Sequence, residues 1–285
     1  MDDNLIIEDH ILKGYKETGI ITVEIPEGIV AISDNAFSDF PYLSNVSLPK
    51  SLKKIGNGVF QNCTKLVGID LTNIKCIGVK AFAGCTSLQQ VSFGESITYL
   101  PNALFLGCTA LTEITLPSNI SYIGCECFKD CTALLTVNTD GVMEIDNNAF
   151  ENCGTLSNIT LPSSLNHISP NAFSFCDKLK KITFNNRFID IDELAFENAV
   201  DFTINSAQNS AAQNYAKTNH YRFRPTIVDS DYRIVTDEHL QIIKKSGILF
   251  YARKPDENKD EIIIHFDKSI ANQIEQLIGG KPNDK

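Results

Sequence analysis

Three cysteines and three charged side chains lie close together in the run Cys125–Cys131 (CECFKDC). Thiolates at this spacing can ligate a tetrahedral metal ion. The repeat described below, however, gives the three cysteines different roles: Cys131 lies on a buried ladder, Cys127 replaces a buried alanine, and Cys125 lies in a turn. Side chains that point in different directions cannot converge on one ion, so we predict no metal site here. A labile redox role for Cys125 or Cys76 stays open.

The histidines show no catalytic pattern. No pair has metal-ligand spacing, none neighbours a nucleophile motif, and the chain lacks Gly-x-Ser-x-Gly, Walker-type and Gly-x-Gly-x-x-Gly sequences. His167 occupies a position where other copies of the repeat carry Lys54, Tyr99 or Glu144, so we predict a surface residue rather than a base. We therefore expect no catalytic residue, metal ion or cofactor. An active site in the C-terminal module is the least supported alternative. The five histidines are His10, His167, His220, His239 and His265.

An internal repeat dominates the sequence and is the framework for every other prediction. Phenylalanines recur at steps of 22 or 23 residues, and a cysteine follows most of them three residues later. A Leu-x-x-Ile-x-Leu segment follows each cysteine, as in Leu66–Leu71 and Leu111–Leu116. Both 22-residue steps lack the proline that often comes next, which indicates a deletion in a surface turn. The phenylalanines are Phe37, Phe60, Phe82, Phe105, Phe128, Phe150, Phe173 and Phe196, and the cysteines are Cys63, Cys85, Cys108, Cys131, Cys153 and Cys176.

The repeat predicts stacked coils with two short strands each. The Ile-x-Leu pair alternates with period two, which is typical of a strand with one apolar face. One coil has no second layer against which to bury that face, whereas stacked coils bury it continuously. The six ladder cysteines then become small, buried, apolar side chains rather than disulfides, and the odd total of 9 cysteines agrees with this interpretation.

The pattern Leu-x-x-Ile-x-Leu-Pro…Ile-x-x-Ile-Gly-x-x-Ala-Phe-x-x-Cys resembles the BspA-type leucine-rich repeat over roughly Ile6 to Phe223. This family is abundant in bacterial and protist proteins, many of them at cell surfaces. The resemblance implies an α/β fold: a right-handed leucine-rich-repeat solenoid of about eight or nine rungs of 22–23 residues, with parallel strands on a concave face. For exported members it implies adhesion or host contact.

The expected organisation has four parts. Residues 1–19 form an N-terminal cap of two short strands, 20–205 the repeat array, 206–224 a C-terminal cap, and 225–285 a small α+β module. A solenoid needs caps because its terminal rungs would otherwise expose apolar edges. The C-terminal cap is predicted as a helix with Ser210 as its N-cap residue, followed by a strand at Tyr221–Phe223.

The module shows no repeat. Residues 236–245 could form a short helix, and a hairpin over Leu240–Arg253 is equally compatible with the sequence. Ser269–Ile278 is predicted to be an amphipathic helix because Ile270, Ile274, Leu277 and Ile278 share a face. Strands are expected at Tyr232–Val235, Ile248–Tyr251 and Ile262–Phe266.

The outward residues of the first strand in each repeat are the leading candidates for ligand binding. Stacked, they form a polar, hydrogen-bonding surface of the kind that solenoids use for recognition. Small polar residues also favour solvated strands, and the absence of aromatic and arginine anchors argues against tight binding. The C-terminal module and the Tyr99–Tyr122 pair are alternatives. The candidates are Asn45, Ser47, Asp70, Gln90, Ser92, Glu113, Thr115, Thr136, Asn138, Asn158, Thr160, Lys181 and Thr183.

The charge and hydrophobicity of the chain limit the classes of partner that it could bind. The net charge of −10 disfavours a nucleic-acid partner. No stretch approaches the roughly 20 apolar residues of a membrane helix, so we expect no membrane insertion. The acidic N-terminus is not a signal peptide, which predicts a cytoplasmic protein as given, or a surface or secreted one if a signal had been removed. We predict a non-enzymatic scaffold that binds a protein or glycan. The alternative is an intracellular adaptor whose module carries the output.

Overall fold

The computed structural model describes residues 2–226, 230–235, 240–243, 251–253, 262–267 and 271–278. The chain divides into two compact units: Met1–Ser206 with Ser210–Phe223, and Ala207–Asn209 with Arg224–Lys285. The finer division into caps and array stays a prediction.

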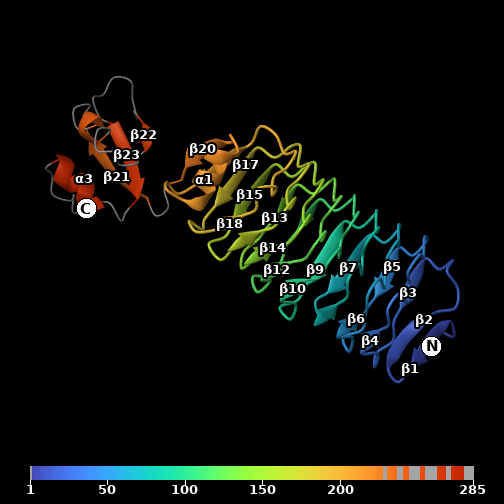
Figure 1. Ribbon diagram of the computed structural model, residues 1–285. Helices are drawn as coiled ribbons and strands as arrows, with labels where there is room; N and C mark the ends of the chain where they lie inside the picture. Colours follow the sequence, from blue (N-terminus) through green and yellow to red (C-terminus); the bar gives the residue numbers. More distant parts are fainter. Residues whose placement is uncertain are drawn as a thin grey trace. The chain divides into compact units, whose positions relative to one another are not determined.

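Two columns of short parallel strands build the first unit, one strand of each column per repeat (Figure 1). Strands of one column pair with a shift of one whole repeat, so that Tyr99 lies opposite Tyr122 and Ile159 opposite Ile182. The first column is β3 (Thr22–Glu24), β5 (Asn45–Ser47), β7 (Gly68–Leu71), β9 (Gln90–Phe93), β11 (Glu113–Ile114), β13 (Thr136–Val137), β15 (Asn158–Leu161), β17 (Lys181–Phe184) and β19 (Thr203–Ser206). The second column is β4 (Ala31–Ile32), β6 (Lys54–Ile55), β8 (Cys76–Ile77), β10 (Tyr99–Leu100), β12 (Tyr122–Ile123), β14 (Glu144–Ile145), β16 (His167–Ile168) and β18 (Asp190–Ile191).

Phenylalanines form a continuous ladder through the core. All eight rings are fully buried, and successive rings stack with centroids 5.2–5.8 Å apart and interplanar angles of 5–18°. The alternating Ile and Leu side chains of the strands fill the space beside them. The nine strands of the first column, stacked on this core, confirm the predicted solenoid.

The ladder cysteines are free and fully buried, as predicted. Each thiol donates a hydrogen bond to the carbonyl of the phenylalanine in the preceding repeat. The Cys85 Sγ lies 3.1 Å from the Phe60 oxygen, and the Cys131 Sγ lies 3.2 Å from the Phe105 oxygen. The Phe60 and Phe105 oxygens also accept from the backbone amides of Cys63 and Cys108, at 3.1 and 3.0 Å, so each thiol supplies a second donor to its carbonyl.

Both ends of the first unit carry the predicted elements. β1 (Leu5–Glu8) pairs antiparallel with β2 (Ile11–Tyr15), and β2 continues the second column through β4. At the other end, α1 (Ala211–Thr218) has Ser210 as its N-cap residue, and the Ser210 hydroxyl accepts a hydrogen bond from the Gln213 amide. β20 (Arg222–Pro225) follows β19 in its sheet.

The second unit contains a three-stranded antiparallel sheet in the order β21–β23–β22. β21 (Ser230–Val235) and β23 (Ile262–Asp267) confirm two predicted strands. β22 (Tyr251–Arg253) lies later than expected, and residues 248–250 of that prediction fall outside the described residues. Residues 240–243 are helical with Leu240 and Ile243 buried, so the hairpin alternative is wrong there: the 3-residue spacing of two apolar side chains suits a helix face.

α3 (Ala271–Ile278) confirms most of the last predicted helix, with Ile274 buried. Residues 236–239, 244–247, 269–270 and 279–280, which carried parts of these predictions, lie outside the described residues. Among the helices that the structure describes, none is long and apolar enough to cross a membrane.

Candidate functional site

The predicted ligand-binding residues lie together on one surface. We call it the strand face: the outward side chains of β5, β7, β9, β11, β13, β15 and β17 and of the residue following β11 and β13. Eleven of the thirteen candidates are exposed, and Asn138 and Thr183 are half-buried. Pairing aligns them across strands, with Asn158 opposite Lys181 and Thr160 opposite Thr183. The period-two alternation alone therefore located this surface correctly, while its role in binding stays a prediction.

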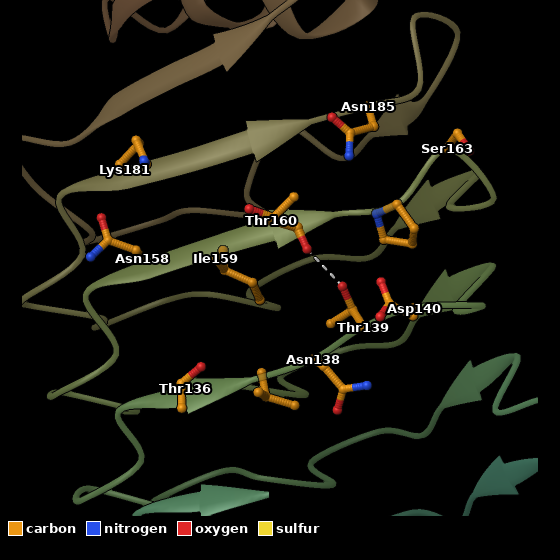
Figure 2. A pocket seen from close by; sticks show the side chains of 12 residues that line it. Thr136, Asn138, Thr139, Asp140, Asn158, Ile159, Thr160, Ser163, Lys181 and Asn185 are labelled. Atoms are coloured by element: carbon orange, nitrogen blue, oxygen red, sulfur yellow. Dashed lines mark hydrogen bonds between the residues drawn. The ribbon is translucent and has the colours of Figure 1, made fainter. Parts of the chain in front are cut away.

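A hollow of about 500 Å³ lies on the strand face over β13, β15 and β17 (Figure 2). Five of the predicted residues line it, and they come from three consecutive repeats. The lining residues are Thr136, Val137, Asn138, Thr139, Asp140, Asn158, Ile159, Thr160, Pro162, Ser163, Lys181 and Asn185.

The hollow forms where one repeat departs from the Ile-x-Leu pattern. Thr139 occupies the position of the buried leucines Leu116 and Leu161, and it is itself buried. A threonine hydroxyl at an apolar position needs a partner, and Thr139 Oγ1 donates to the Thr160 carbonyl oxygen at 2.8 Å (Figure 2). β13 ends at Val137, whereas β15 and β17 each run for four residues.

Asn138 holds this irregular segment against the preceding repeat. Its side-chain Nδ2 donates to the Leu116 carbonyl oxygen at 2.9 Å, and its Oδ1 accepts from the Leu116 amide at 2.6 Å. The side-chain amide thus pairs with both backbone groups of one residue, as a strand neighbour would. The floor of the hollow is therefore fixed by hydrogen bonds to the repeats on both sides.

A tight turn then carries Asp140 to the rim. Gly141 has a φ of +85°, and a Cβ atom built there would lie 1.9 Å from the Ser118 carbonyl oxygen, so only glycine fits. Sequence reasoning missed Thr139, Asp140, Ser163 and Asn185 because it considered only strand positions. The signal was present: Val137–Gly141 (VNTDG) breaks the Ile-x-Leu-Pro pattern in one of the two 22-residue repeats.

The charges around the hollow cancel. Asp140 and Lys181 are the only charged residues among its lining residues, so its formal charge is zero although the chain carries −10. The other polar groups are amides and hydroxyls, which both donate and accept hydrogen bonds. The arrangement can therefore bind a neutral polar ligand by hydrogen bonding.

Replacing Asn138 by alanine should destabilise the first unit by about 2 kcal/mol, because the half-buried Leu116 amide and carbonyl would both lose their partner. Urea unfolding of the full chain measures this free energy. Thr136→Ala, two residues earlier and exposed, is the control and should change it by less than about 0.5 kcal/mol. Equal effects of the two variants would show that the Asn138 amide does not support the segment.

Tyr99 and Tyr122 lie side by side on the second column, as predicted, in adjacent strands β10 and β12. A hollow of about 260 Å³ lies beside them. The Tyr122 hydroxyl donates to the Asp146 carboxylate at 2.5 Å, and burial together with this bond raises the pKa of Tyr122. Tyr99 is 47% exposed. The pair belongs to a different strand column from the larger hollow.

The remaining candidates lie apart from both hollows. His167 lies on β16, and its Nδ1 is 2.8 Å from the Asp190 carboxylate on the neighbouring strand. Its side chain is 37% exposed, which confirms the predicted surface position. Burial raises the pKa of Cys125, which disfavours a reactive thiolate. Cys76 is exposed. Across the part of the chain that the structure describes, no three His, Cys, Asp or Glu side chains gather so as to hold a metal ion.

Stacked two-strand coils with aliphatic, phenylalanine and cysteine ladders define a leucine-rich-repeat protein. The BspA type leucine rich repeat region matches residues 12–135 and 98–223 in six copies, and the chain belongs to this family. Proteins of this family are solenoid scaffolds that are generally not enzymes.

Two solved structures are similar. The T. pallidum leucine rich repeat protein TpLRR is 26% identical with a TM-score of 0.55, covering 75% of this chain and 89% of that one. A leucine-rich repeat protein from Bacteroides ovatus ATCC 8483 is 24% identical with a TM-score of 0.51, covering 72% of this chain and 66% of that one. No curated protein matches the chain.

Proposed function

We propose that this protein is a non-enzymatic scaffold that binds a protein or glycan partner through the strand face, with the hollow over β13, β15 and β17 as the centre of contact. The observation that carries the proposal is the position of that hollow: five residues chosen from the repeat pattern line it, together with the residues of an irregular repeat. Ligand sites are usually concave, and convergent polar groups in them fix the orientation of the ligand.

The physical character of the surface supports binding rather than chemistry. Its exposed side chains are mostly Asn, Thr, Ser and Gln on rigid strands, which present fixed hydrogen-bonding groups without a nucleophile and base in contact. A rigid surface loses little conformational entropy when it binds a partner. Its charged groups, such as Asp70 and Glu113, lie on separate strands β7 and β11.

Charge reversal on the strand face tests the proposal. Asp70→Lys with Glu113→Lys should weaken binding of the full chain to purified cell-surface glycoproteins and immobilised oligosaccharides about tenfold or more, since like charges or lost hydrogen bonds at a contact cost about 1–3 kcal/mol. The matched control is Glu144→Lys with Asp190→Lys on the exposed second column, which makes the same change in net charge. Binding measured by biolayer interferometry that falls equally in both variants, or only in the control, would contradict the proposal.

A further inference from the structure

We infer that the hollow over β13, β15 and β17 binds one or two rings of a neutral oligosaccharide. This inference rests on the proposed function and specifies its ligand. The volume of about 500 Å³ lies within the range of about 300–1,000 Å³ that is typical of small-molecule sites.

The hydrogen-bonding groups match those of a sugar. Asn158 and Asn185 each present an NH₂ donor beside a carbonyl acceptor, and both residues are exposed at the hollow. Thr136, Thr160 and Ser163 add exposed hydroxyls, which donate and accept. Neighbouring hydroxyls of a sugar ring also donate and accept, so amide and hydroxyl side chains can satisfy them in pairs. Figure 2 shows these side chains around one open area of the strand face.

The charge of the site selects a neutral ligand. The lining of the hollow has one positive charge, on Lys181, and one negative charge, on Asp140, whereas the whole chain has a net charge of −10. An anionic sugar would meet no excess of positive charge in the hollow and a repulsive field from the rest of the chain. A cationic peptide would find stronger attraction elsewhere on so acidic a protein.

The apolar lining is too small for a protein anchor. Val137 and Ile159 are buried, Pro162 is half-buried, and the twelve lining residues include no aromatic, Arg, Met or Leu side chain. Protein contacts depend on such anchors filling apolar pockets. The hydrogen bonds of Asn138 and Thr139 also fix the floor before binding, which reduces the entropy cost for a weakly held polar ligand.

A glycan array tests the inference with the full chain. It should carry neutral hexose and N-acetylhexosamine oligosaccharides of two to six units, together with sulfated and uronic-acid oligosaccharides. We expect binding to a subset of the neutral ones, with an affinity that changes less than about twofold between about 50 and 500 mM NaCl because no ion pair forms. Asn158→Ala with Thr160→Val should weaken it about tenfold or more, since two hydrogen bonds are lost.

A matched control lies outside the strand face. Asn214 and Thr218 are exposed on α1 and line neither hollow. Asn214→Ala with Thr218→Val makes the same two kinds of substitution and should leave oligosaccharide binding unchanged, and circular dichroism should show both variants folded.

Other results would overturn the inference. Binding confined to sulfated or uronic-acid sugars and weakened by salt, or an equal loss in the α1 control, would show that the hollow is not a neutral-sugar site. An array without any bound sugar would overturn it too. In that case, a glycoprotein whose binding still depends on Asp70 and Glu113 would support the proposed function without the sugar site. If no such partner bound, the proposed function and the inference would both be contradicted.

Discussion

Raising the pH from about 8 to about 10 should unfold the first unit under reducing conditions, because seven buried thiols cannot ionise in the fold. Burial raises the pKa of Cys63 and of Cys176 from the ordinary value of 9.0 to about 12. Burial also raises the pKa of each of the other five, which are Cys85, Cys108, Cys127, Cys131 and Cys153.

Between pH 9.0 and these raised values, the folded chain keeps thiol protons that the unfolded chain has released. The thiols therefore contribute their full stability below about pH 9, and the free energy of unfolding falls as pH rises toward 12. One pH unit above the ordinary pKa, each buried thiol lowers the free energy of unfolding by about 1.4 kcal/mol. The seven thiols together therefore lower it by roughly 10 kcal/mol. This is comparable with the whole stability of a typical domain, about 5–15 kcal/mol.

Urea unfolding followed by circular dichroism at several pH values, with a reductant present, measures this effect. Replacing Cys108, Cys131 and Cys153 by alanine removes three of the seven ionising groups. The pH dependence of the unfolding free energy above pH 9 should then fall by about three-sevenths, even if the variant is less stable at neutral pH. If the unfolding free energy of the triple variant had the same pH dependence as that of the wild type, ionisation of the buried thiols would not be its cause.

Replacing Phe128 by alanine should lower the free energy of unfolding by about 3–5 kcal/mol, the second largest effect. Its ring is fully buried and lies between Phe105 and Phe150, at centroid distances of 5.5 and 5.2 Å. The cavity would interrupt the phenylalanine ladder in the middle of the array. Since each coil contacts only its neighbours, this loss weakens the coupling between the two halves of the solenoid.

Phe188→Ala provides the control for this substitution, since Phe188 is 89% exposed. It should change the free energy of unfolding by less than about 0.5 kcal/mol. Equilibrium urea unfolding measures both variants, and a broadened or two-step transition for Phe128→Ala alone would reveal the loss of coupling. A Phe128→Ala protein as stable as the wild type would contradict the stacked ladder.

The second unit has no repeat, so its elements could be predicted only from local sequence patterns. The alternating and apolar runs at Tyr232–Val235 and Ile262–Phe266 predicted two strands correctly, since strand pairing needs only a local pattern that a neighbour can match. A helix over residues 236–245 and a hairpin over Leu240–Arg253 fitted the sequence equally. The structure decided residues 240–243 in favour of a helix with Leu240 and Ile243 buried.

The sequence by itself determined the solenoid, the phenylalanine and cysteine ladders and the strand face. A stacked repeat places the same residue of every copy in the same environment, so periodicity reports burial directly. Only the tertiary structure decided where that face becomes a hollow. Asn138 and Thr139 look like minor departures from the pattern, and their roles depend on partners in neighbouring coils, Leu116 and Thr160, that are 22 and 21 residues away. Such contacts across coils depend on the geometry of stacking, which a one-dimensional period does not contain.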